Sequence, residues 1–230
     1  MSPSKLPNRS IDPAGSVIAL LIIALWLTSL AVLLHWQFDY ANPMVYLAIL
    51  VQMHLYTGLF ITAHDAMHGS VSRKAFWNRA LGWVSAILFS FNFYDKLLPK
   101  HHEHHRYVAT GQDPDYHQSD HFWKWYWSFI STYLSPLQLV LMGLAFWGLQ
   151  VFFPLPNLVL FWMVPAILST FQLFYFGTYL PHRGEHPNRH KSGSQVKNHL
   201  WAFLSCYFFG YHYEHHDSPG TPWWRLWRMK

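Results

Sequence analysis

The sequence is poor in charged residues and almost without cysteine. Only 12% of its 230 residues are Asp, Glu, Lys or Arg, whereas 52% are hydrophobic and 19% are aromatic. This composition is too apolar for an ordinary soluble domain of this length, so it favours a membrane protein. The single cysteine, Cys206, excludes an internal disulfide framework and a thiolate-based zinc or iron–sulfur site. Any metal site must therefore be built from imidazole and carboxylate groups.

A dense block of basic residues is also missing. The 16 Lys and Arg residues are spread among the connecting segments, and the formal net charge is only +5. Proteins that bind nucleic-acid phosphates gather such side chains in a patch or stripe. The sequence therefore predicts no nucleic-acid partner. Histidine, in contrast, is abundant, with 17 residues, more than Lys and Arg together.

Four apolar runs predict transmembrane helices, because each is close to the length needed to cross a hydrocarbon core of about 30 Å. A fifth apolar segment, Ala80–Phe91, is too short to span and predicts a helix that dips into the membrane. The predicted fold is an all-α integral membrane protein, with four transmembrane helices in two hairpins and a histidine-rich cap, forming one domain over residues 1–230. The four runs are Pro13–Phe38, Val45–Ala63, Leu137–Phe153 and Leu158–Leu180.

The distribution of basic residues predicts the orientation in the membrane. If the amino terminus is cytoplasmic, all 16 Lys and Arg lie on the cytoplasmic side. The two turns expected outside, Gln37–Asn42 and Pro154–Asn157, contain none. Cytoplasmic loops carry the excess of Lys and Arg in membrane proteins. We therefore expect both termini and every histidine cluster on the cytoplasmic face.

Three histidine clusters lie at the ends of the predicted spans. One is a pair at spacing i, i+4, and the other two follow the pattern His-x-x-His-His, in which positions i, i+3 and i+4 share one helix face. Unliganded imidazoles packed this closely would repel one another when protonated, which favours a metal site over structural histidines. His182 ends the last apolar run and is expected as a ninth ligand, with His186, His190 and His199 as alternatives. The clustered residues are His64, His68, His101, His104, His105, His212, His215 and His216.

The number of imidazoles indicates two metal ions. Eight are too many for one tetrahedral zinc, and the chain has no His-Glu-x-x-His sequence. Imidazole suits iron as well as zinc, so the residues alone leave the metal open. Neutral ligands call for carboxylates that orient them, although each acid could instead be a solvated loop charge. The candidates are Asp65, Asp113, Asp115 and Asp217, with Glu103 and Glu214 as weaker ones.

These histidine boxes resemble those of the membrane fatty acid desaturase and hydroxylase superfamily. Within it, the chain resembles the bacterial-type β-carotene ketolases over nearly its whole length. The matching stretches are His64–Gly69, Gly111–Tyr116, Phe176–Arg183 (FGTYLPHR) and Gly210–Trp224 (GYHYEHHDSPGTPWW). The first box is shorter than is usual in acyl desaturases, which favours a ketolase or hydroxylase.

The resemblance implies a cofactor, a reaction and partners. It implies two non-haem iron ions, with O2 as co-substrate, that oxidise C4 and C4' of β-ionone rings to ketones by successive hydroxylation. β-Carotene would give echinenone and canthaxanthin, and zeaxanthin, if hydroxylated rings are accepted, would give astaxanthin. The implied iron ligands are His64, His68, His101, His104, His105, His182, His212, His215 and His216.

The implied setting is the bacterial inner membrane, with a carotenoid substrate taken from among the membrane lipids. Electrons must come from outside, because the sequence has no flavin, nicotinamide or haem motif. A ferredoxin-type donor on the basic face near Arg183, Arg189 and Lys191 fits this need. The alternatives are a fatty acyl or lipid hydroxylase or desaturase, a carotenoid 3-hydroxylase and a membrane metal transporter.

Overall fold

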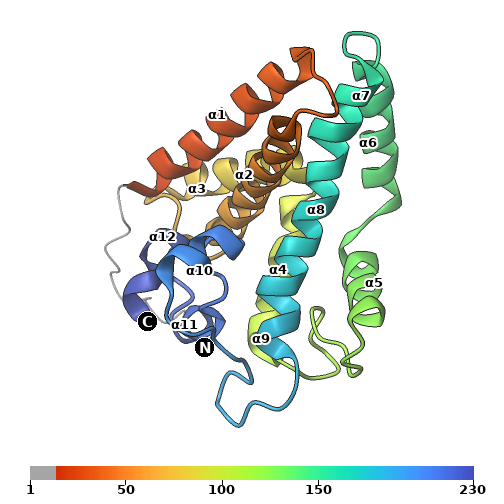
Figure 1. Cartoon of the computed structure of the whole chain (residues 1–230). Helices are drawn as coiled ribbons and strands as arrows, with labels where there is room; N and C mark the ends of the chain where they lie inside the picture. Colours follow the sequence, from red (N-terminus) through yellow and green to blue (C-terminus); the bar gives the residue numbers. More distant parts are fainter. Residues whose placement is uncertain (1–13) are drawn as a thin grey trace.

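A computed structural model of the chain describes residues 14–230. Every regular element in this part of the chain is a helix, as the sequence predicts (Figure 1). The predicted cytoplasmic amino terminus lies outside the described residues. Helices α4, α9 and α11, which bear most of the clustered histidines, lie together at the lower end of the molecule in Figure 1.

The first two helices cross the upper part of the molecule and are joined by a short loop. Helix α1 (Ala14–His35) has 22 residues and α2 (Pro43–Met67) has 25. At about 1.5 Å per residue each exceeds the roughly 30 Å of a bilayer core. The two helices pack through Trp26 and Tyr56, whose ring centroids are 5.0 Å apart. Helix α2 starts where the side chain of Asn42 accepts a hydrogen bond from the Met44 N–H, directly before Pro43.

A third long helical stretch, Leu155–His182, has 28 residues. It consists of α7 (Leu155–Leu158), α8 (Val164–Leu173) and α9 (Leu180–His182), linked by π-helical turns over Val159–Met163 and Phe174–Tyr179. Each π turn ends two residues before a proline, Pro165 or Pro181. A proline ring displaces the carbonyl one turn earlier, and a wider turn relieves that clash without ending the helix. The stretch therefore continues to His182.

The predicted span over Leu137–Phe153 is only partly a helix. Helix α6 (Pro136–Leu149) has 14 residues, and it is bent by 85° from α5 (Phe122–Tyr133). Fourteen residues cover about 21 Å, which is less than the bilayer core. By length and composition, three helices of the described chain can cross a membrane, or four if this bent pair counts as one span. The predicted total of four spans stays a prediction.

The two turns predicted on one side of the membrane lie side by side. The side-chain amide of Asn157 donates hydrogen bonds to the carbonyls of Leu33 and Trp36, both at 2.8 Å. Asn157 follows α6 and the carbonyls belong to the end of α1, so one buried side chain joins the two loops. Figure 1 shows both turns at the end of the molecule opposite the histidine-bearing helices.

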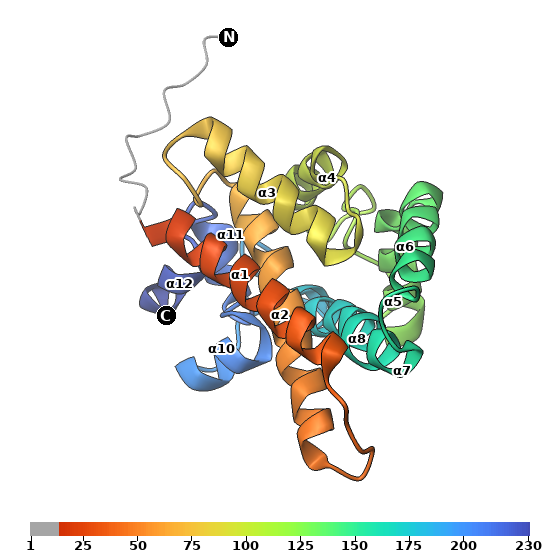
Figure 2. The same cartoon turned by 90° about the horizontal axis from the view of Figure 1, so that it is seen from above.

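Helices α3 (Ala75–Ser90) and α4 (Tyr94–Tyr107) pack beside α2 (Figure 2). The short helix predicted at Ala80–Phe91 is present as α3, although it starts five residues earlier. A β-carbon at Gly82 would lie 2.5 Å from the Tyr94 ring and 2.8 Å from the Ala66 side chain. Glycine is therefore required where α3 meets the histidine-bearing end of α2.

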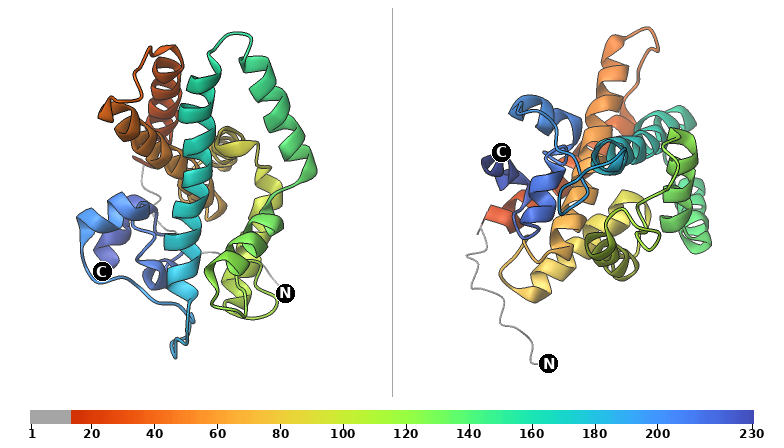
Figure 3. Two further views of the ribbon diagram at one scale, coloured as in Figure 1. Left: turned by 45° about the vertical axis from the view of Figure 1, so that its right-hand side comes forward. Right: turned by 90° about the horizontal axis from the view of Figure 1, so that it is seen from below.

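The remaining helices lie beside the ends of α2 and α9 (Figure 3). They are short: α10 (His199–Cys206), α11 (His212–Asp217), α12 (Trp223–Leu226) and a final 3₁₀ turn over Trp227–Met229. The backbone N–H of Trp223 donates a 2.9 Å hydrogen bond to the Asp65 carboxylate, which joins α12 to α2. This contact helps to hold α11 against the ends of the longer helices.

Candidate metal centre

The end of α2 is fixed by a buried asparagine that follows it. The Asn78 amide donates a 2.7 Å hydrogen bond to the Ala66 carbonyl, and its oxygen accepts from the N–H groups of Val71 and Ser72 at 3.1 and 3.2 Å. These bonds satisfy the backbone where the helix ends. The last turn of α2 is thereby held so that His64 and His68 point in one direction. Sequence reasoning missed Asn78, because nothing near it in the sequence marks its partners.

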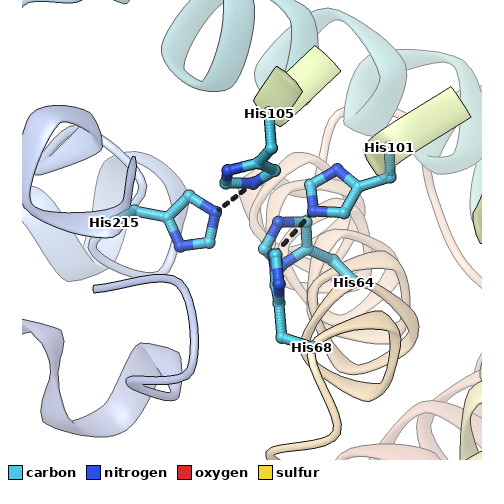
Figure 4. Close-up of side chains that lie close together, drawn as sticks. All are labelled: His64, His68, His101, His105 and His215. Atoms are coloured by element: carbon cyan, nitrogen blue, oxygen red, sulfur yellow. Dashed lines mark hydrogen bonds between the residues drawn. The ribbon is translucent and has the colours of Figure 1, made fainter. Parts of the chain in front are cut away.

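Five of the predicted ligand histidines form one group. Each offers a ring nitrogen, and these nitrogens all lie within 4.8 Å of one another. The Nε2 atoms of His68 and His101 are 2.6 Å apart, and those of His105 and His215 are 3.1 Å apart. Figure 4 shows the rings converging from α2, α4 and α11. We call this group the five-histidine cluster: His64, His68, His101, His105 and His215.

The other four predicted ligands form a second group beside the first. All four are buried, and their nitrogens also lie within 4.8 Å of one another. The Nε2 atom of His212 is 2.9 Å from the Nε2 atoms of both His182 and His216. The His104 and His216 Nε2 atoms are 3.2 Å apart. We call this group the four-histidine cluster: His104, His182, His212 and His216.

The two His-x-x-His-His motifs divide between the clusters in opposite ways. In α4, positions i and i+4 (His101 and His105) join the five-histidine cluster and i+3 (His104) joins the other. In α11, positions i and i+4 (His212 and His216) join the four-histidine cluster and i+3 (His215) joins the five-histidine cluster. At about 100° per residue, i+3 and i+4 point some 100° apart, so one helix serves two neighbouring sites.

The outward-facing nitrogens show which way the imidazole lone pairs point. The Nδ1 atom of His104 is 2.9 Å from the Asp113 carboxylate, and that of His182 is 3.2 Å from the Lys191 carbonyl. Both partners are acceptors, so each Nδ1 carries the proton and each Nε2 lone pair points into the cluster. Converging lone pairs repel one another unless a cation lies between them. Metal-binding histidines have the same arrangement, with the outer N–H bound to a carboxylate or carbonyl.

An unpartnered nitrogen in the five-histidine cluster fits a metal as well. The Nε2 atom of His64 is buried and has no hydrogen-bond partner among the described residues, while its Nδ1 atom is 3.2 Å from the Asp65 carboxylate. A buried polar atom without a partner costs free energy, roughly 1–3 kcal/mol. A bound cation would remove that cost. The residues present therefore fit two metal ions.

Burial keeps most of these imidazoles neutral, as metal ligands must be. Desolvation, reinforced by neighbouring imidazoles, holds the pKa values of His212, His215 and His216 well below the ordinary 6.5. The same causes lower the pKa of His105 to about 2. For His104 desolvation also acts downward, but the charges of Asp115 and Asp113 outweigh it and raise the pKa. The carboxylates of Asp113 and Asp115 therefore favour a positive charge at His104.

Three of the four predicted supporting acids lie at the clusters. Asp65 bridges His64 and the backbone of Trp223, and Asp113 contacts His104 while accepting from the Ala109 and Asp115 N–H groups. One Asp115 oxygen is 3.8 Å from His104 Nδ1, and the other accepts a hydrogen bond from the Tyr133 hydroxyl. Sequence reasoning missed the Tyr133 contact and the Lys191 carbonyl, because neither leaves a local sequence signal.

Asp217 lies apart from both clusters. Its side chain is 39% exposed and is bound by Arg189 and His190. The His190 ring centroid is still 5.9 Å from that of His216, so Asp217 reaches the four-histidine cluster only through a second side chain. The weaker candidate Glu214 binds Ser194 and Lys230 instead. Among the described residues, neither acid is hydrogen-bonded to any of the nine histidines.

The alternative histidines have other partners. His186 binds the Arg183 carbonyl, and His199 binds the Tyr211 hydroxyl. His190 contacts Asp217, as described above. His54 stacks on Tyr207 with ring centroids 4.3 Å apart. Four histidines were candidates for the ninth ligand. Among the described residues, only His182 belongs to one of the two histidine clusters.

A small cavity lies between the clusters and the helix bundle. Its volume is about 50 Å³. Histidines of both clusters line it, together with apolar side chains such as Phe60, Leu173 and Phe209. Asp115 and Tyr133 form part of its wall. The clusters therefore face a mainly apolar cavity whose polar wall is formed by Asp115 and Tyr133.

Comparisons with known proteins agree with this site. The fatty acid desaturase family model matches residues 41–142 and 120–230. A "Beta-carotene ketolase" from one Paracoccus strain is 37% identical over 240 residues, which covers 98% of this chain and 96% of that protein. No solved structure gives a significant match.

Algal relatives are longer than this chain. A "Beta-carotene ketolase" of Haematococcus lacustris is 42% identical over 188 residues, and the match covers 75% of this chain but 58% of that protein. A "Zeaxanthin 4-ketolase" of Chlamydomonas reinhardtii is 36% identical over 244 residues, covering 96% of this chain and 54% of that protein. The chain thus spans little more than half the length of these algal relatives.

Proposed function

This chain belongs to the fatty acid desaturase family, and from that premise we propose that it is a membrane β-carotene 4-ketolase with two iron ions held by its nine clustered histidines. One observation carries the proposal: the nine buried or half-buried imidazoles of the two clusters, in a chain that is 37% identical to a ketolase over nearly its whole length. Ligands of imidazole type suit iron.

Each cluster would hold one iron ion. The five-histidine cluster offers five nitrogens and the four-histidine cluster offers four, so six-coordinate ions would keep one and two open positions, respectively. When bound, the ions would supply the activation of O2, which protein side chains alone do not perform. Asp113 and the Lys191 carbonyl orient His104 and His182 from outside, and Asp65 does so for His64.

Once it has widened, the apolar cavity would receive one end ring of the carotenoid. Its wall joins histidines of both clusters to Phe60, Leu173 and Phe209, so a ring that entered there would lie next to the clusters. Binding in this position would fix the reacting carbon next to the metal site and would exclude water from it. C4 is allylic, which makes its C–H bonds the weakest on the ring.

Two oxidations of the same carbon would give the ketone. Each replaces one C–H of the C4 methylene by C–OH, uses one O2, two electrons and two protons, and releases one water. The resulting geminal diol then loses a third water to become the ketone. The four electrons must be supplied by another protein. A ferredoxin-type donor that docks on the basic surface near Arg183, Arg189 and Lys191 fits this requirement.

We also propose the orientation in the membrane. Four spans, with α5 and α6 as one bent span, would place both termini and the clusters in the cytoplasm. The lysine- and arginine-free turns that Asn157 joins would then face the other side, as the distribution of basic residues requires. This orientation brings the clusters to the side where soluble electron donors are found.

Product analysis tests the function. A bacterium that makes β-carotene should accumulate echinenone and canthaxanthin when it expresses this chain, and zeaxanthin supplied instead should give astaxanthin. His215→Ala is the matched negative control, because it removes one ligand at the five-histidine cluster. Unchanged carotenoids together with altered acyl chains would identify a lipid hydroxylase or desaturase instead. Stoichiometric zinc, in cells supplied with iron, would contradict the iron proposal.

A further inference from the structure

A second, larger cavity lies next to the one at the metal centre. Its volume is about 450 Å³. It is bounded by the link before α4, by α4 itself, and by the bend between α5 and α6 at Leu134 and Ser135. Below, the cavity of about 50 Å³ at the clusters is called the inner cavity and this one the outer cavity.

Two side chains line both cavities and so separate them. They are Leu97 of α4 and Tyr133 at the end of α5. Leu97 is 4% exposed, and its side chain borders the space of both cavities. The Tyr133 hydroxyl donates a hydrogen bond to Asp115 on the inner side, and the Lys100 ammonium lies 5.1 Å from the Tyr133 ring centroid. Polar contacts thus hold the tyrosine across the passage.

The inner cavity is too small for the proposed substrate. One water molecule takes roughly 10–15 Å³ of such space. The inner cavity, at about 50 Å³, therefore holds only a few waters, whereas the end of a carotenoid is a trimethylcyclohexene ring. A ring can reach the clusters only if the partition opens and the two cavities join.

The outer cavity adjoins an exposed apolar surface of the protein. Helix α6 stands at the edge of the molecule, and in α6 only Gln138 is buried (Figures 1 and 2). Leu137 and Leu139 are each 52% exposed, and Leu134, which lines the outer cavity, is 38% exposed. On the opposite wall, α4 contributes four charged side chains, whose apolar stems line the cavity while their charged ends reach water: Asp95, Lys96, Lys100 and Glu103.

We propose that the outer cavity is the entrance through which a carotenoid passes from the bilayer, and that Leu97 and Tyr133 form its gate to the metal centre. This inference depends on the proposed function. The tyrosine swings away from Asp115 toward the outer cavity, the ring enters the joined space, and the polyene chain stays in the outer cavity. Tyr133 and Leu97 are positioning residues, because they control the approach of the ring and do not act on it.

The first test measures occupancy of the outer cavity without any turnover. Cys206 is the only cysteine of the chain and is fully buried. A second cysteine introduced in the wall of the outer cavity is therefore the thiol that a reagent can reach. The Leu134→Cys variant of the full chain, in detergent micelles without an electron donor, is labelled with N-ethylmaleimide. β-Carotene should slow this labelling severalfold. Leu139→Cys, on the lipid-facing side of α6, is the matched control and should react equally fast with or without β-carotene.

The second test narrows the gate. One extra methylene in a tight pocket already changes rates by about tenfold or more, so Leu97→Trp should lower ketone formation at least about tenfold. Iron content and folding should stay those of the wild type. Leu97→Ile, which keeps the volume, should restore activity. Tyr133→Phe removes only the hydrogen bond to Asp115 that holds the gate closed, so it should lower KM for β-carotene, whereas Leu97→Trp should raise it.

The outcomes separate this inference from the proposed function. If the wild-type chain makes ketocarotenoids but β-carotene protects Leu134→Cys no better than Leu139→Cys, the entrance lies elsewhere and the inference is wrong. If Leu97→Trp keeps full activity, the gate is wrong. If the wild-type chain makes no ketone at all, the proposed function fails, whatever the labelling shows.

Discussion

The two histidine clusters differ in how their ligands are held. The four-histidine cluster is fully buried, and two of its rings are oriented from outside by Asp113 and the Lys191 carbonyl. In the five-histidine cluster, His68, His101 and His105 are only half-buried, and Asp65 orients a single ring, that of His64. One cluster therefore has fewer ligands with firmer support, and the other has more ligands with less support.

This difference predicts different sensitivity to substitution. A site with four ligands and fixed outer contacts should bind metal tightly, but its metal affinity should fall strongly when any one contact is removed. A site with five ligands can lose one and still keep four. Since the motifs of α4 and α11 each serve both clusters, neighbouring residues in one helix can be used to compare them.

The largest effect is expected from adjacent ligands on α11. His215→Ala and His216→Ala should both reduce ketone formation below detection, because each would remove a ligand from one of the two proposed iron ions. Metal analysis should still tell them apart. His216→Ala leaves three ligands in its cluster and should lose that iron, whereas His215→Ala leaves four and should keep more of its own.

The control for this pair is a histidine with the same chemistry outside both clusters. His199→Ala removes a ring that contacts Tyr211 and no cluster histidine among the described contacts, so its iron content should match the wild type. Equal iron loss in His215→Ala and His216→Ala would show that the two clusters do not differ in stability. A retained ketone product in either variant would remove that residue from the ligands.

A smaller effect is expected from the supporting acids. Asp113→Asn keeps the size of the side chain but removes the charge next to His104, and such substitutions cost about 10–100-fold in metal affinity. Asp65→Asn is the counterpart at the five-histidine cluster, where the contact to His64 is longer at 3.2 Å and supports one ligand of five. It should cost less. Competition with a chelator measures both, and the reverse order would contradict the comparison.

Asp115→Asn should have a weaker effect again. Its carboxylate is 3.8 Å from His104 Nδ1, beyond hydrogen-bond distance, and acts on that ring by charge alone. We expect activity to fall severalfold while the melting temperature and the iron content stay close to those of the wild type. Product yield and thermal unfolding measure this. Unchanged activity would show that Asp115 has no part in the reaction.

The sequence predicted which histidines come together, because helical spacing is local. Positions i, i+3 and i+4 share a helix face wherever the helix lies, so the three boxes could be recognised without knowing the fold. His182 was predicted from its place at the end of an apolar run. The all-α class and the short helix before α4 followed from the same apolar patterns, and both are confirmed.

The division of the nine histidines between two clusters could not be predicted. It depends on how α4 and α11 face each other, and no local pattern reports a contact between residues more than 100 positions apart, such as His105 and His215. The roles of Asn78 and the Lys191 carbonyl could not be predicted either, because their hydrogen bonds involve backbone groups, which leave no pattern in the sequence. The break in the run at Leu137–Phe153 was missed because the uncharged residues continue past the end of α6 at Leu149.

The smallest effect is expected at Asp217, which lies beside the four-histidine cluster in sequence but not in contact. Its carboxylate pairs with Arg189 and His190 at the surface, where water screens the attraction between the charges. Asp217→Asn should therefore leave iron content and ketone yield within about twofold of the wild type. Asp113 contacts a ring of the four-histidine cluster, whereas Asp217 only follows His216 in the sequence. Comparing the two variants therefore tests whether an acid must contact a cluster histidine to support metal binding. If Asp217→Asn lost iron as Asp113→Asn does, support would reach His216 through the His190 ring, and the four-histidine cluster would extend one side chain further toward the surface.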